Sequence, residues 1–276
     1  MSCQVAPGSA SSSKSDRRRR ELAKRHSLGQ HYLTDPSVVR SMIDLAAIRP
    51  GERVLEIGMG RGALTRELVG RGDRFEGYEI DAGNFAALEK EFGRSATLRR
   101  GDAFASSPDF DVLLSSLPYS ESSRFVEWLS QRRYDRAVVM LQSDFASKIT
   151  SPPGGSDYRA VSVISQASST AEVVEGVPRD AFEPPPRVNS CLVTIKWKRT
   201  LSQGQVSMIK KIFSQKRRTV KAALKSLGLP QPPSAPGTTV ESFPLQCRVN
   251  ALRPDSVLAM VGVLAKSSSP NGSLKG

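Results

Sequence analysis

Short apolar runs alternate with stretches of helical periodicity from residue 53 onward. Runs rich in β-branched and aromatic residues predict strands at 53–57, 75–80, 97–100, 110–115 and 137–141. Apolar residues recurring every three or four positions predict helices near 62–71, 83–92, 122–131 and 143–149. This alternation is typical of an α/β fold with a mostly parallel sheet covered on both faces.

The pattern differs at the two ends of this region. Before the first strand, Asp35 or Thr34 can cap a helix with Pro36 in its first turn. After a helix near 159–167, strands at 171–177 and 190–198 flank the proline-rich segment 182–186. These two strands predict an antiparallel hairpin at one edge, which brings the sheet to seven strands.

Beyond residue 199 the strand signals stop. Helical periodicity fits 203–213, 216–227 and 254–265, with a segment rich in Pro, Gly and Ser at 228–239. We therefore expect a small C-terminal all-helical domain. The expected organisation is a disordered basic arm, an α/β domain, the helical domain and a tail, at 1–26, 27–198, 199–266 and 267–276.

The charge is distributed unevenly. The chain has 40 Lys and Arg residues against 27 Asp and Glu, a formal net charge of +13. Residues 184–240 hold eleven basic residues and no acidic one, and residues 1–26 hold seven basic and two acidic residues. Two basic flanks around a mildly acidic middle favour a polyanionic partner, with nucleic acid ahead of a membrane surface. A solubilising excess of charge is the simpler alternative.

Composition excludes several other classes. No apolar run approaches the roughly 18 residues of a membrane span. Cys3, Cys191 and Cys247 lie too far apart for a metal motif and indicate a reducing compartment, so we expect a cytoplasmic protein. With only His26 and His31 available, a His-rich metal centre is excluded, and we expect no metal.

The first predicted strand runs into the glycine-rich stretch EIGMGRGALT, residues 56–65. Gly58 and Gly60 let a ligand approach the backbone at the carboxyl edge of the sheet, where such folds bind ligands. Glu79 lies at the last but one position of the second predicted strand, 21 residues after Gly58, and its carboxylate can accept both ribose hydroxyls. This arrangement suits a nicotinamide cofactor, S-adenosylmethionine or a plain tight turn.

The next two strand ends favour a methyl donor. Asp102 follows the third strand and can accept a hydrogen bond from an adenine amine, while the fourth strand ends in SSLPYS, residues 115–120. A proline fixes the direction of the preceding carbonyl, and Tyr119 offers a flat face on which an extruded base can stack. An enzyme that methylates an amine uses such a turn, whereas an NAD-dependent oxidoreductase has no need of it.

Eight ordered motifs carry a family resemblance over residues 27–265. They are GQHYLTD (29–35), EIGMGRGALT (56–65), YEID (78–81), GDA (101–103), SLPYS (116–120), VVMLQSDFASKI (138–149), FEPPPRVNS (182–190) and IFSQKRRTVKAAL (212–224). The sequence resembles the small-subunit ribosomal RNA adenine-N6 dimethyltransferases and, more distantly, the erythromycin-resistance rRNA methylases. The resemblance implies a class I, Rossmann-like methyltransferase sheet with a small C-terminal helical domain.

The resemblance also implies roles for single residues. His31 and Leu33 match the contacts to the methionine part of S-adenosylmethionine. The remaining cofactor positions are Gly58 and Gly60 along its backbone, Glu79 at the ribose, Asp102 at the adenine and Ser116 on the SLPYS turn.

Ser116 departs from the family pattern, which has asparagine before Leu-Pro-Tyr. In the family, that amide oxygen and the adjacent backbone carbonyl accept the hydrogens of the target amine. The catalytic positions are therefore Ser116, Leu117 through its carbonyl, and Tyr119. A serine hydroxyl is shorter but still accepts one hydrogen bond. This difference leaves open a second hypothesis, a weakly active or inactive ribosome-assembly factor that retains cofactor and RNA binding.

The expected partner is small-subunit ribosomal RNA within an immature small subunit, bound by a monomer. Phe182 is a candidate for the second face against the target base. The expected RNA-binding residues coincide with the segment that lacks acidic residues, and they are Lys210, Lys211, Lys216, Arg217, Arg218, Lys221 and Lys225.

Overall fold

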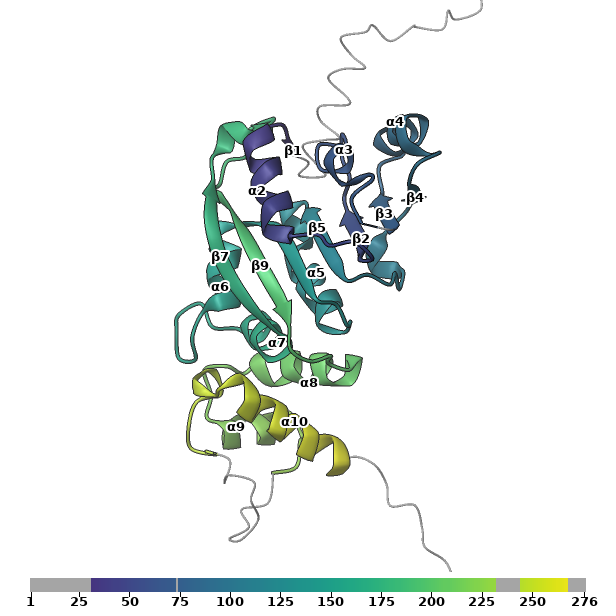
Figure 1. Cartoon of the computed structure of the whole chain (residues 1–276). Helices are drawn as coiled ribbons and strands as arrows, with labels where there is room; N and C mark the ends of the chain where they lie inside the picture. Colours follow the sequence, from purple (N-terminus) through teal and green to yellow (C-terminus); the bar gives the residue numbers. More distant parts are fainter. Residues whose placement is uncertain (1–30, 73, 232–243, 268–276) are drawn as a thin grey trace, which may run out of the picture.

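A seven-stranded sheet organises the computed structural model, which describes residues 31–72, 74–231 and 244–267. Its strand order is β4-β3-β2-β5-β6-β9-β7 (Figure 1). The strands are β2 (Arg53–Ile57), β3 (Arg74–Glu79), β4 (Thr97–Arg100), β5 (Val112–Ser116), β6 (Arg136–Gln142), β7 (Ser169–Val177) and β9 (Ser190–Trp197). The first five run parallel, and β9 lies antiparallel between β6 and β7. The expected edge hairpin is confirmed, as is the class of fold.

Helices cover both faces because the strands alternate their buried side chains. Leu55 and Leu113 belong to one hydrophobic cluster, together with α5 (Ser122–Ser130), α6 (Ser143–Thr150) and α7 (Ala160–Ser168). Val54 and Val112 belong to a second cluster, together with α2 (Pro36–Ala46) and α3 (Thr65–Leu68). Successive strand residues point to opposite faces, so each strand contributes to both clusters.

Local capping fixes where two of the helices begin. The Asp35 carboxylate accepts a hydrogen bond from the Ser37 amide at 2.7 Å, and Pro36 occupies the first turn of α2. Asp81 caps α4 (Ala82–Phe92) in the same way, accepting from the amides of Gly83 and Asn84. The second cap lies just after β3, so it directs the chain out of the sheet at the edge where Glu79 ends its strand.

Several predicted boundaries were wrong, including those of two helices and one strand. The helix expected at 62–71 is only α3 (Thr65–Leu68), because Gly62 and Gly70 adopt positive φ on either side of it. The helix expected at 216–227 is α9 (Val220–Ser226), which begins at a Thr219 cap after a turn. The second strand ends at Glu79, and the Ile80 side chain beyond it is 68% exposed.

A two-stranded ribbon joins distant parts of the chain. β1 (Tyr32–Leu33) pairs antiparallel with β8 (Phe182–Glu183), with Leu33 opposite Phe182. The short helix η3 (Arg179–Ala181) leads into β8, and the Ala181 carbonyl accepts the Thr34 amide at 2.9 Å. The proline-rich segment thus holds the chain that precedes α2.

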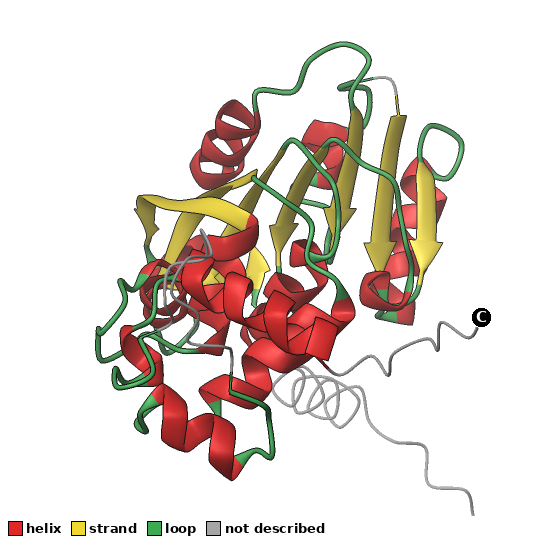
Figure 2. Cartoon of the chain, turned by 90° about the horizontal axis from the view of Figure 1, so that it is seen from below, coloured by secondary structure: helices red, strands yellow, loops and turns green. Residues whose placement is uncertain are grey.

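The C-terminal helices lie at the lower end of the sheet in Figure 1, and helices fill the front of the molecule when it is seen from below in Figure 2. They are α8 (Gln203–Phe213), α9, η4 (Val249–Ala251) and α10 (Pro254–Ser267). Ile209, Leu224 and Val257 are fully buried and belong to the same hydrophobic cluster as α5 and α7. The core therefore continues from the sheet into these helices. The expected basic arm at 1–26 and nearly all of the expected tail lie outside the described residues.

Candidate active site

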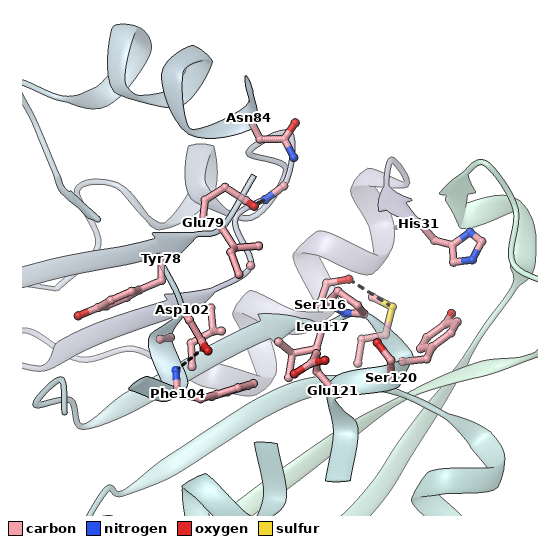
Figure 3. A pocket seen from close by; sticks show the side chains of 18 of the residues that line it. His31, Tyr78, Glu79, Asn84, Asp102, Phe104, Ser116, Leu117, Ser120 and Glu121 are labelled. Carbon is pink, nitrogen blue, oxygen red and sulfur yellow. Dashed lines mark hydrogen bonds between the residues drawn. The ribbon is translucent and has the colours of Figure 1, made fainter. Parts of the chain in front are cut away.

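A cavity of about 300 Å³ opens at the carboxyl ends of β2, β3 and β5. Four successive connections supply its walls: the glycine loop after β2, the turn after β3, the turn after β4 and the SLPYS turn after β5. Figure 3 shows side chains from these loops converging on one space. Parallel strands present their carboxyl ends on one side, so residues far apart in sequence meet there.

The glycine loop brings backbone close to the cavity. Gly58 and Gly60 have φ of 77° and 56°, a region that favours glycine. A Cβ atom added to Gly60 would lie 3.2 Å from the Tyr32 ring, so both conformation and space restrict this position. Gly58 and Gly60 line the cavity as the sequence predicted.

Glu79 is a buried carboxylate held by backbone groups. It is 4% exposed, and its Oε2 accepts the Gly60 amide at 2.6 Å while Oε1 accepts the Asp81 amide at 2.7 Å. Burial raises the pKa of Glu79, and these backbone hydrogen bonds lower it in part. The side chain is therefore fixed at the cavity wall with lone pairs available for further donors.

Asp102 lies across the cavity, at the turn after β4. Its Oδ1 accepts the Phe104 amide at 2.8 Å and caps the short helix η1 (Ala103–Ala105). Its Oδ2 accepts a hydrogen bond from Arg124 Nη2 at 2.6 Å. Both oxygens thus have one protein donor, and the carboxylate borders the cavity (Figure 3).

The SLPYS turn forms the third wall. The Ser116 hydroxyl donates toward the sulfur of Met140, with Oγ and Sδ 4.0 Å apart (Figure 3). Leu117 follows it and is buried. The Tyr119 hydroxyl is 2.6 Å from Ser190 Oγ, and burial raises the pKa of this phenol although the bond to Ser190 lowers it. Ser116, Leu117 and Tyr119 all line the cavity.

The β1–β8 ribbon supplies the remaining wall. His31 Nδ1 donates to the Pro184 carbonyl at 2.7 Å, and its ring stacks on Tyr119 with centroids 5.8 Å apart. Phe182 is 4% exposed and lines the cavity. Leu33 is buried opposite Phe182 and borders a smaller adjoining cavity of about 40 Å³. The structure therefore brings the predicted cofactor positions together around the main cavity, except for Leu33, which borders the smaller cavity beside it.

Glu56 is a titratable residue that sequence reasoning passed over. It lies on β2, is 1% exposed and accepts a hydrogen bond from Thr65 Oγ1 at 2.8 Å. Burial raises the pKa of this carboxyl to about 8. It borders the same small cavity as Leu33. A carboxylate at the fourth position of an apolar strand was the signal that could have identified it.

Several residues that were not predicted as site residues also line the main cavity, among them Ile80, Phe104, Glu121, Arg124 and Met140. Each stands within or close to a motif that the sequence did single out, so proximity to a strand end was the available signal. Their directions depend on turn and helix geometry that the sequence pattern does not specify.

Most of the predicted RNA-binding residues are exposed. Six are exposed on or beside α8 and α9, namely Lys210, Lys211, Arg217, Arg218, Lys221 and Lys225. Of these, Lys210 pairs with Glu127 at 2.8 Å. The Lys216 ammonium donates to the Tyr158 carbonyl at 3.3 Å, and burial lowers its pKa. Lys210, Lys216, Arg217 and Arg218 line an open groove together with Arg159, which the sequence did not single out.

Two other features bear on the chemistry. In the ranges 31–72, 74–231 and 244–267, no group of three or more His, Cys, Asp or Glu side chains is placed to hold a metal ion. No helix within the described ranges has the length and apolar character needed to cross a membrane.

Known proteins resemble this chain along most of its length. The family model for ribosomal RNA adenine dimethylase matches residues 21–266. The probable ribosomal RNA small subunit methyltransferase A of Pyrococcus abyssi is 34% identical over 200 residues, covering 72% of this chain and 74% of its own. The ribosomal RNA small subunit methyltransferase A of Moorella thermoacetica is 34% identical over 237 residues, covering 76% and 82%.

Solved structures agree in fold. A dimethyladenosine transferase from Plasmodium falciparum superposes with a TM-score of 0.70 at 25% identity, covering 84% of this chain and 99% of its own. The 23S rRNA methyltransferase ErmE superposes with a TM-score of 0.60 at 24% identity, covering 85% and 99%.

Proposed function

Because the chain belongs to the ribosomal RNA adenine dimethylase family, we propose that it transfers methyl groups from S-adenosylmethionine to the N6 amine of adenosines in small-subunit ribosomal RNA. One observation carries the proposal: Glu79, Asp102 and the SLPYS turn face a single cavity. The alternative of an NAD-dependent oxidoreductase was wrong, since the family is one of RNA methylases.

The residues around the cavity fit S-adenosylmethionine. Glu79 offers buried carboxylate oxygens for ribose hydroxyls, and Asp102 offers an acceptor for the adenine amine. Gly58 and Gly60 expose backbone between them, and His31 lies at the opposite wall, with Leu33 behind it. When bound, the cofactor supplies an electrophilic methyl group on a sulfonium centre.

The protein's part in the reaction is to orient the nucleophile. The lone pair of an adenine amine is delocalised into its ring, so the amine attacks poorly unless its hydrogens are held. We assign this role to the Leu117 carbonyl and the Ser116 hydroxyl, which lie at the cavity wall on one turn. These dipoles also stabilise positive charge that develops on the nitrogen. Orienting two reactants in this way can lower a barrier by several kcal/mol, on the order of effects measured for intramolecular reactions.

Two aromatic rings are placed to hold the target base. Tyr119 is fixed by Ser190 at 2.6 Å and by the His31 ring at 5.8 Å between centroids. Phe182 is fixed by the β1–β8 ribbon. Both line the cavity, so a base extruded from RNA has aromatic surface available beside the amine-holding turn.

RNA binding is assigned to the basic surface of α8 and α9. Lys211, Arg217, Arg218, Lys221 and Lys225 are exposed there, and Arg159 joins Lys216 along the adjoining groove. We expect mainly phosphate contacts and recognition of RNA shape. The division into a methyltransferase domain at 27–198 and an RNA-binding domain at 199–266, a monomeric state and a cytoplasmic location belong to the same proposal.

The orientation of Ser116 favours one second candidate, an assembly factor with little catalysis. Its hydroxyl is directed at Met140 Sδ, 4.0 Å away, where the family has a longer amide. Both candidates bind S-adenosylmethionine and immature small subunits, so binding alone does not distinguish them.

Methyl transfer to immature small subunits tests the proposal. Subunits from cells lacking the family methylase are incubated with the protein and cofactor labelled in its methyl group, and the RNA is digested to nucleosides. Labelled N6-methylated or N6,N6-dimethylated adenosine supports the enzyme. Cofactor and subunit binding without label supports the assembly factor, and failure to bind the cofactor contradicts both.

A further inference from the structure

Arg124 lines the cavity from the first turn of α5, where a basic residue is unfavourable. It is the third residue of α5, and the positive end of a helix dipole disfavours a cation in the first turn. Two carboxylates offset this cost. Arg124 Nη2 lies 2.6 Å from Asp102 Oδ2, and Nη1 lies 3.4 Å from Glu121 Oε2.

Phe104 completes a compact cluster around Asp102. The Arg124 guanidinium carbon lies 4.9 Å from the centre of the Phe104 ring, while the Phe104 amide donates to Asp102 Oδ1 at 2.8 Å. One carboxylate oxygen is thus held by backbone and the other by the guanidinium. Asp102 cannot rotate without losing one of these bonds.

The cluster contributes little to stability as an ion pair. The side chains of Arg124, Asp102 and Glu121 are 52%, 30% and 36% exposed. Exposed pairs of this kind are worth about 0–1 kcal/mol. All three line the cavity, so the arrangement is better explained by what it does for a ligand.

We infer that Arg124 is a positioning residue that holds the Asp102 carboxylate as an oriented acceptor for the exocyclic amine of the cofactor's adenine. An ionised carboxylate accepts hydrogen bonds only, and each of its oxygens has a second lone pair beyond the one that its protein donor uses. The fixed Asp102 therefore favours a purine that carries an amine over one that carries a carbonyl at the same position. This inference rests on the proposed cofactor site.

The experiment compares two ligands that differ at one purine substituent. S-adenosylhomocysteine and S-inosylhomocysteine are titrated by calorimetry into the wild-type protein and the Arg124→Gln variant. Arg124→Gln should weaken S-adenosylhomocysteine about tenfold and leave S-inosylhomocysteine nearly unchanged. The double variant Asp102→Asn/Arg124→Gln should bind no more weakly than Asp102→Asn alone, because Arg124 acts through Asp102.

Two controls separate the outcomes. Arg132 follows α5 in sequence, and its guanidinium carbon lies 3.9 Å from the centre of the Trp128 ring. Because Arg132 does not contact Asp102, Arg132→Gln should change neither affinity. Thermal unfolding of Arg124→Gln should remain within a few degrees of wild type. Equal weakening of both ligands, or no weakening, overturns the role of Arg124. If the wild-type protein binds neither ligand, the proposed cofactor site itself fails.

Discussion

Ser116 is the residue whose chemistry differs most from the family pattern. Its hydroxyl lies at the cavity wall but points toward Met140 Sδ, and Leu117 supplies the neighbouring carbonyl. In the proposed mechanism, a shorter acceptor whose hydroxyl points toward Met140 leaves most of the orientation of the target amine to the Leu117 carbonyl. The rate of methyl transfer should therefore be limited at this position.

Ser116→Asn should raise kcat for methyl transfer at least about tenfold, because one well-placed polar group can contribute on the order of 10² in rate. The measurement is single-turnover transfer of labelled methyl to immature small subunits. Ser120→Asn is the matched control, since Ser120 lines the same cavity on the same turn and should leave kcat unchanged. An unchanged kcat for Ser116→Asn, or an equal rise in both variants, contradicts the assignment.

Glu56 should make stability depend on pH in an unusual direction. Its pKa is about 8 in the folded protein against an ordinary 4.5, so between these values the folded state retains a proton that the unfolded state releases. The free energy of unfolding should consequently fall as pH rises from about 5 to 8, by up to about 1.4 kcal/mol per pH unit from this group.

Urea unfolding across that pH range measures the effect, and Glu56→Gln should make the profile less steep by removing the contribution of this group, while the raised pKa of Glu79 still contributes in the same direction. The variant retains a partner for Thr65 but cannot titrate. Glu89→Gln, exposed on α4, should keep the wild-type profile. Parallel profiles for wild type and Glu56→Gln would show that this carboxyl is ionised in the folded protein.

Sequence reasoning identified those residues of the candidate cavity that stand at strand ends. Glu79, Asp102 and Ser116 could be found because a parallel sheet brings such positions to one edge. Phe104 and Arg124 were missed because the direction of their side chains depends on a helical turn after each strand. The pairing of Lys210 with Glu127 was also missed, because the two residues lie 83 positions apart in sequence.

At the scale of elements, strands were predicted more accurately than helices. The buried runs around Leu55 and Leu113 fix a strand within one or two residues. Helix length depends on capping and on glycine conformation, and α3 is short for that reason. Pairing across long sequence separations, as between β1 and β8, has no local signal.

Helix α8 should depend on its buried face. Ile209 is fully buried in the cluster that continues into the sheet, so Ile209→Ala should lower the free energy of unfolding by about 2–5 kcal/mol. Lys211→Ala, exposed on the same helix, should change it by less than about 0.5 kcal/mol. Urea unfolding measures both. A comparably small loss for Ile209→Ala would show that α8 packs loosely.

Among the described residues, α8 and α9 carry a basic surface away from the cavity. Eleven basic residues and no acidic one occupy 184–240, and Figure 1 places the helices of that stretch at the opposite end of the molecule from α4. A ligand pocket and a basic surface on different elements suit a large polyanionic substrate that reaches both.

RNA affinity should fall steeply with salt, because bound phosphates release counterions. Replacing Arg217 and Arg218 together by Gln should reduce the slope of log Kd against log salt by about 2. Filter binding to small-subunit RNA measures the slope. Arg94→Gln, exposed just after α4, is the control and should leave the slope unchanged. An unaltered slope in the double variant would indicate that RNA binds to another surface of the protein.

The β1–β8 ribbon also constrains how the molecule is made. Tyr32 pairs with Glu183, so β1 finds its partner strand only after about 150 further residues have been synthesised. Such distant pairing is slow to form compared with local structure. A growing polypeptide therefore has its glycine loop long before His31 and Phe182 can enclose it, and the pocket is complete only once β8 has been synthesised and has paired with β1.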